Sequence, residues 1–127
     1  MRAADTNVLV RLLTRDDPQQ TAAAERWIGG GAWVPILALA ETTWVLDAVY
    51  ERTREQIASA ISMLLDHTEL TLQDPDVVAA ALEQFTRRSS PGFTDCLLLE
   101  IARKAGHLPL GTFERQLGRL DGAERLR

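Results

Sequence analysis

Short segments of strand character alternate with longer segments of helical periodicity, and this alternation restricts the fold more than any other feature. The strand-like segments are residues 2–4, 32–35, 70–73 and 108–112. Apolar residues recur at helical spacing over 6–14, 19–28, 36–50, 54–65, 75–87 and 95–105, and we expect one more helix at the C-terminus. Short strands separated by helices predict an α/β fold, with a short central parallel sheet flanked by helices.

Proline, glycine and threonine mark several expected helix ends. Pro18 suits the first turn of the second helix, and the three glycines at 29–31 close it. Thr94 can cap the helix at 95–105, and Gly106 is placed to end it. The six expected helices between residues 6 and 105 therefore have recognisable limits.

Length and composition indicate one soluble domain, residues 1–127. The chain has the size of a single domain, and 46% hydrophobic with 25% charged residues is ordinary for a globular protein. No apolar run is long enough for a bilayer, so no membrane partner is expected. Asp5 lies too early for a secretory signal, and the single Cys96 cannot form an internal disulfide. We expect a cytoplasmic protein.

The charge balance limits how the protein can bind nucleic acid. A net charge of −4 and a pI near 5.1 exclude a uniformly basic surface, so any RNA contact must be local. All but one of the basic residues are Arg, whose planar guanidinium suits phosphate oxygens.

Four carboxylates stand in positions that suggest a shared site. Asp5 follows the first strand and Glu114 follows the last, at sheet edges where ligands bind in open α/β folds. Glu41 is expected on the same helix face as Leu37, Trp44, Val45 and Ala48, and Asp95 on the same face as Leu98, Leu99 and Ala102. A buried unpaired carboxylate is costly, so such acids must be protonated, paired with Arg or bound to a cation.

Each acid also has a purely structural explanation. Asp5 could cap the first helix, Asp95 and Glu114 could favour helix N-termini, and Glu41 could pair with an Arg. Taken together, the four favour a Mg²⁺ or Mn²⁺ site, because these ions prefer oxygen ligands and can activate water for attack on phosphorus.

Four short motifs contain these acids: Asp-Thr-Asn-Val-Leu at 5–9, Leu-Ala-Glu at 39–41, Phe-Thr-Asp at 93–95 and Thr-Phe-Glu at 112–114. Their order and spacing resemble the PIN-domain ribonuclease toxins of the VapC family, the toxins of VapBC type II toxin–antitoxin systems. The resemblance covers nearly the whole chain. It implies a three-layer PIN fold, endoribonuclease activity on RNA, a VapB-like antitoxin partner and a homodimer.

The resemblance also assigns roles to individual residues. It implies that Asp5 and Asp95 bind Mg²⁺, for which Mn²⁺ can substitute, and that Glu41 and Glu114 complete the catalytic site. Asn7 and Thr112 match polar supporting positions.

The chain departs from the family pattern in its last motif. Glu114 stands where the family usually has Asp, and Gln116 and Leu117 stand where a further acid often follows. These departures favour one metal ion over two.

Two other functions compete with a nuclease. A receiver-type phosphoryl-transfer domain also gathers acids at strand ends, but it alternates strands and helices regularly, whereas the middle of this chain is mostly helical. A catalytically weak or inactive PIN-like module that only binds RNA or protein is the closer alternative. The presence of all four carboxylates argues against this alternative. The replacement of the usual Asp by the longer Glu114 argues for it.

Overall fold

The computed structural model describes residues 1–127 and divides them into two compact units, Met1–Pro75 and Asp76–Arg127, which we describe separately. None of the helices is both long enough and apolar enough to cross a membrane.

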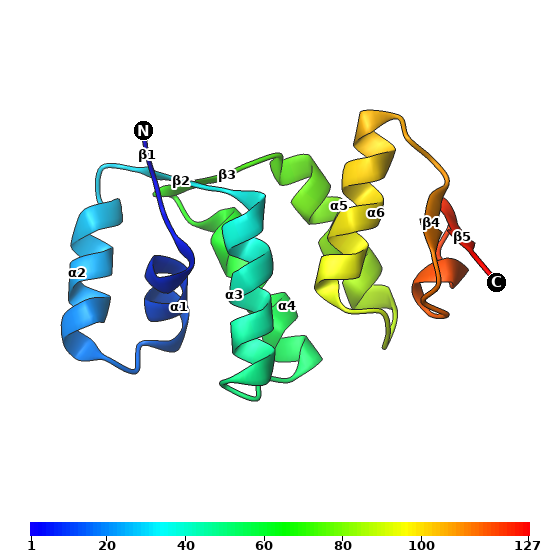
Figure 1. Ribbon diagram of the computed structural model, residues 1–127. Helices are drawn as coiled ribbons and strands as arrows, with labels where there is room; N and C mark the ends of the chain where they lie inside the picture. The colour runs from blue at the N-terminus through cyan, green and yellow to red at the C-terminus, as the bar shows by residue number, and fades with distance from the viewer. The chain divides into compact units, whose positions relative to one another are not determined.

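A parallel three-stranded sheet forms the centre of the first unit. Strands β1 (Arg2–Ala3), β2 (Ala32–Val34) and β3 (Leu70–Leu72) lie in the order β1-β2-β3 (Figure 1). Helices α1 (Thr6–Thr14) and α2 (Pro18–Ile28) connect β1 to β2, and α3 (Ile36–Ala48) and α4 (Arg54–Asp66) connect β2 to β3. Parallel strands require such crossovers. The predicted α/β class with a short parallel sheet is confirmed.

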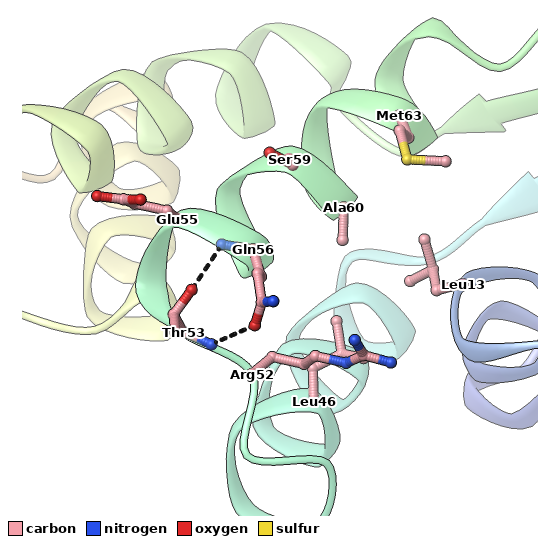
Figure 2. Close-up of a pocket in the computed structure, with 9 residues that line it drawn as sticks. All are labelled: Leu13, Leu46, Arg52, Thr53, Glu55, Gln56, Ser59, Ala60 and Met63. Carbon is pink, nitrogen blue, oxygen red and sulfur yellow. Dashed lines mark hydrogen bonds between the residues drawn. The ribbon is translucent and has the colours of Figure 1, made fainter.

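Side-chain caps explain where three of these helices begin. Asp5 accepts a hydrogen bond from the Val8 N–H at 3.1 Å, and Asp17 accepts one from the Gln20 N–H at 3.1 Å. At the start of α4, Thr53 and Gln56 accept from each other's backbone N–H groups, which forms a capping box (Figure 2). The helix starts in this unit are therefore set by local sequence.

Helix α3 contradicts the predicted choice of buried face. The core side chains are Ala38, Leu39, Thr42, Thr43 and Leu46. Leu37 and Trp44 are 70% and 65% exposed, and Glu41 is exposed between them. The prediction that Glu41 lies on the core-facing stripe was wrong, because apolar residues occur around most of the helix and their spacing does not select one face.

The second unit contains α5 (Pro75–Arg87), whose first residue belongs to the first unit, α6 (Phe93–Ala105), and strands β4 (Leu110–Thr112) and β5 (Ala123–Arg125), which pair in parallel. Phe85 and Phe93 pack edge to face with ring centroids 5.7 Å apart. Helix α6 begins one residue before Thr94, and its N-cap is Gly92 without a side-chain hydrogen bond, so the predicted Thr94 cap was wrong.

The predicted C-terminal helix was also wrong. Residues after β4 form only the 3₁₀ turn Leu117–Arg119 and then β5. Gly118 lies so close to β5 that a Cβ there would be 2.7 Å from the Arg125 Cβ, and Gly122 has a positive φ of 95°. Both glycines disfavour a helix, and buried Leu117 and Leu120 anchor the turn instead.

Candidate active site

Two of the four predicted acids line one open pocket in the first unit. Asp5 follows β1, and Glu41 projects from α3, which begins two residues after β2. The pocket has a volume of about 610 Å³, and Thr6, Asn7, Pro35 and Leu37 are among its other lining residues. The Thr6 hydroxyl donates to Glu41 Oε2 at 3.3 Å, so the start of α1 is joined to α3 beside the acids.

Asp5 combines a structural role with a place in this pocket. Its Oδ1 accepts the Val8 N–H, and its Oδ2 makes no hydrogen bond. The helix-cap explanation of Asp5 is therefore correct, and it leaves one carboxylate oxygen available for a ligand. Because the cap fixes the side chain, that oxygen is oriented before any ligand binds.

The other two acids interact within the second unit. Asp95, in the first turn of α6, is half-buried, and this burial together with the negative charge of Glu114 raises its pKa. Glu114 follows β4 in a turn where its backbone N–H donates to the Thr112 hydroxyl at 2.9 Å. Thr112 thus holds the turn that presents Glu114.

None of the four acids has a cationic partner. Other acids of the chain form ion pairs, such as Asp16 with Arg11 and Glu25 with Arg15, but no Lys, Arg or His pairs with the four predicted residues. The alternative that Glu41 is neutralised by an Arg is therefore wrong.

Oxygen ligands of this kind fit Mg²⁺. Neither unit contains a group of three or more His, Cys, Asp or Glu side chains arranged to hold a metal. Mg²⁺ usually takes only one or two carboxylates, with water and substrate phosphate oxygens completing its shell. Asp5 and Glu41 supply two carboxylates to one pocket, and Asp95 and Glu114 are close enough to interact electrostatically.

The most buried acid of the chain was missed by the sequence reasoning. Glu100 on α6 is 8% exposed and accepts from Arg103 Nε at 3.2 Å. Arg103 also donates to the Asp121 carbonyl at 2.6 Å, which ties α6 to the turn before β5. The acid–base spacing of three residues in a helix was the available signal. Because Glu100 is already paired, it is a structural residue.

We compared the chain with models of protein families, with curated proteins and with solved structures. The model of the PIN domain family matches residues 3–123, a span that includes all four acids. Comparison with curated proteins and comparison with solved structures each gave no match. The match covers nearly the whole chain, and this protein therefore belongs to the PIN domain family.

Proposed function

We propose that this protein is a metal-dependent endoribonuclease that acts as the toxin of a type II toxin–antitoxin pair. PIN domains are in general Mg²⁺-dependent nucleases. The observation that carries the proposal is the pair of Asp5 and Glu41, two carboxylates without cationic partners that line the same pocket.

The proposed roles are those that the resemblance to the VapC family implies. Asp5 Oδ2 and Asp95 are the proposed metal ligands. Glu41, which accepts from the Thr6 hydroxyl, and Glu114, whose turn is held by the Thr112 hydroxyl, complete the acidic environment. Bound Mg²⁺ supplies a Lewis acid that lowers the pKa of water and neutralises charge on the leaving oxygen. Burial and the charge of Glu114 raise the pKa of Asp95, and a bound cation would favour its ionised form.

The proposed partners are RNA as substrate, a VapB-like antitoxin and a second copy of the chain. Exposed apolar side chains on and after α3 support a protein partner, since Leu37, Trp44 and Val49 are each more than 60% exposed. A cytoplasmic location fits these partners. The second candidate function is a PIN-like binding module without activity, favoured by the extra methylene of Glu114 compared with the usual Asp.

The test uses purified protein without antitoxin and a mixture of structured RNAs in Mg²⁺, Mn²⁺ or EDTA. Asp5→Asn is compared with Asp17→Asn, because both residues are N-cap aspartates but only Asp5 lines the pocket. Asp95→Asn is compared with Asp76→Asn, since both lie in a first helical turn. Cleavage that requires metal, Asp5 and Asp95 but tolerates both control changes supports the nuclease. Intact RNA in every metal, or equal cleavage by Asp5→Asn, refutes it.

The toxin role needs a separate experiment in cells. Expression of the wild-type chain should arrest growth, and Asp5→Asn should not. Coexpression of a small DNA-binding protein encoded directly upstream should restore growth. Arrest that persists in Asp5→Asn would contradict a toxin that acts by cleavage.

A further inference from the structure

A groove between α1 and α2 adjoins the acidic pocket. Its volume is about 360 Å³, and its lining includes Asn7, Arg11, Gln20, Ala23, Ala24 and Trp27. Asn7 also lines the pocket that contains Asp5 and Glu41. The two hollows therefore share a wall, and a strand of RNA with its phosphate at the acids has the groove as a neighbouring position.

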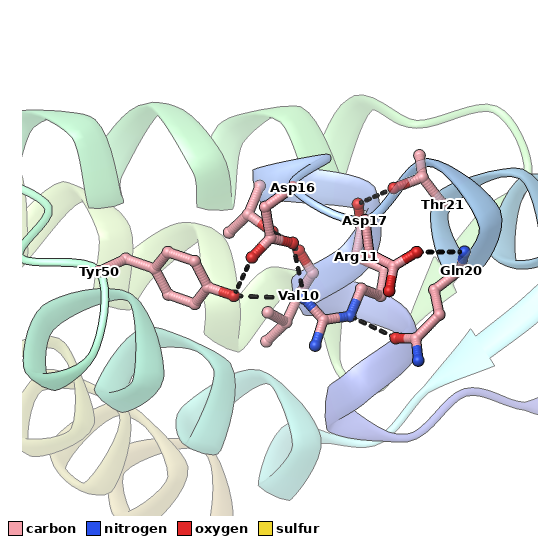
Figure 3. Close-up of polar contacts among 8 residues, drawn as sticks. Val10, Arg11, Asp16, Asp17, Gln20, Thr21 and Tyr50 are labelled. Carbon is pink, nitrogen blue, oxygen red and sulfur yellow. Dashed lines mark hydrogen bonds and ion pairs between the residues drawn. The ribbon is translucent and has the colours of Figure 1, made fainter.

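The polar end of the groove is a preoriented set of donors. Arg11 Nε donates to Gln20 Oε1 at 2.6 Å, and Arg11 Nη1 donates to Asp16 at 2.6 Å and to Tyr50 at 3.3 Å (Figure 3). These bonds leave Arg11 Nη2 and the amide nitrogen of Gln20 without partners, and Figure 3 shows both nitrogens on the same side. The two N–H groups flank the Arg11–Gln20 hydrogen bond, and each can donate to one acceptor of a ligand.

The charge of this end favours a neutral base over a phosphate. Asp16 already pairs with Arg11 and also accepts from the Tyr50 hydroxyl at 2.7 Å. The guanidinium is therefore compensated, and it offers directional donors more than net positive charge. Guanine presents two neighbouring acceptors, O6 and N7, on one edge, which is the pattern that an Arg recognises best among the bases.

The remaining walls suit the flat faces of a base. Ala23 and Ala24 leave room on α2, and Trp27 supplies an aromatic wall. Trp27 is held in place, because Arg2 lies 4.5 Å from its ring centroid and donates to its carbonyl at 3.0 Å. Aromatic walls bind unstacked bases in single-stranded RNA. The volume is near the lower end of ligand pockets, about 300–1,000 Å³, and so fits one base better than a protein helix.

We propose that the α1–α2 groove binds one unpaired guanine of the RNA substrate, with Arg11 and Gln20 donating to its O6 and N7 edge. This inference rests on the proposed function and specifies its substrate: single-stranded RNA with guanine near the cleaved bond. The groove makes guanine the base on which cleavage depends.

The test fills the groove without removing any contact. Ala23→Leu adds a side chain to an exposed position that lines the groove, and Ala22→Leu adds the same side chain at the neighbouring exposed position, which does not line it. Leu is nearly as good a helix former as Ala, so both variants should fold, and their urea midpoints should agree. Binding is measured by fluorescence anisotropy in Mg²⁺, in an Asp95→Asn background, with a uridine oligonucleotide that contains one guanine.

Ala23→Leu is expected to weaken binding about tenfold, in line with the loss of one stacked base, whereas Ala22→Leu should not change it. Replacement of the guanine by 7-deazaguanine, which lacks the N7 acceptor, should weaken binding to the Ala22→Leu protein but not further weaken binding to Ala23→Leu. Equal affinity of the two variants, or no effect of 7-deazaguanine, overturns the proposal. A groove that passes this binding test in a protein whose wild type cuts no RNA would refute the nuclease and leave the guanine site standing.

Discussion

Replacement of Arg103 alone should destabilise the protein more than replacement of Arg103 together with its buried partner, Glu100. The change is Arg103→Met, which keeps much of the side-chain volume but removes every donor. This change leaves the Glu100 carboxylate, whose side chain is 9% exposed, without its cationic partner. It also removes the hydrogen bond from Arg103 to the Asp121 carbonyl. The double variant, Glu100→Met with Arg103→Met, removes this unpaired carboxylate as well.

The contacts set the expected magnitude. Loss of one partner of a buried ion pair costs about 3–5 kcal/mol. The Arg103 side chain is 37% exposed and its Nε is shared between two Glu100 oxygens at 3.2 and 3.4 Å, so solvent and geometry weaken the pair. We expect Arg103→Met to lower the free energy of unfolding by about 2–3 kcal/mol, Glu100→Met by about 1 kcal/mol or less, and the double variant by about 1–2 kcal/mol.

Urea unfolding followed by circular dichroism measures all four proteins of this double-mutant cycle at pH 7. The decisive comparison is between Arg103→Met and the double variant. If the double variant loses as much stability as the two single changes added together, the buried carboxylate is not what makes Arg103 necessary. A loss below about 0.5 kcal/mol for Arg103→Met would refute the argument from burial, because it would equal an ordinary surface change.

Three further predictions concern single acids. Asp5→Ala should unfold about 1 kcal/mol more easily than Asp5→Asn in urea, since Asn can still cap α1, and equal stability would argue against the cap. Hydrogen bonds from Tyr50 and Thr14 lower the pKa of Asp16 from 3.8 to about 2, so its stabilisation is complete above pH 3.8 and is lost as pH falls through about 2. Tyr50→Phe should move this loss of stability to higher pH in a circular dichroism titration. An unchanged curve would contradict the role of the Tyr50 hydrogen bond. Because burial raises the pKa of Asp95, Asp95→Asn should raise the melting temperature in EDTA at pH 7, and Mg²⁺ should stabilise only the wild type. A lower melting temperature of Asp95→Asn in EDTA would contradict that cause.

Local sequence determined most of the helices and strands of this protein. Asp17 with Pro18 starts α2, and Gly106 ends α6. These signals act within a few residues, so the helix limits could be predicted without knowledge of the fold. The alternation of short strands and helices similarly predicted the parallel sheet, because parallel strands need crossover connections. The four acids could be found because their motifs have a characteristic order.

Tertiary structure decided which side of α3 is buried and which acids are exposed. On α3 most faces are apolar, so only the packing of α1 and α4 could select Leu39 and leave Trp44 and Glu41 outside. The same holds at the C-terminus, where the parallel pairing of β5 with β4, made possible by the close approach at Gly118, replaced the expected helix. Periodicity reports whether a segment can form an amphipathic helix, whereas burial and strand pairing depend on neighbours that are distant in the chain.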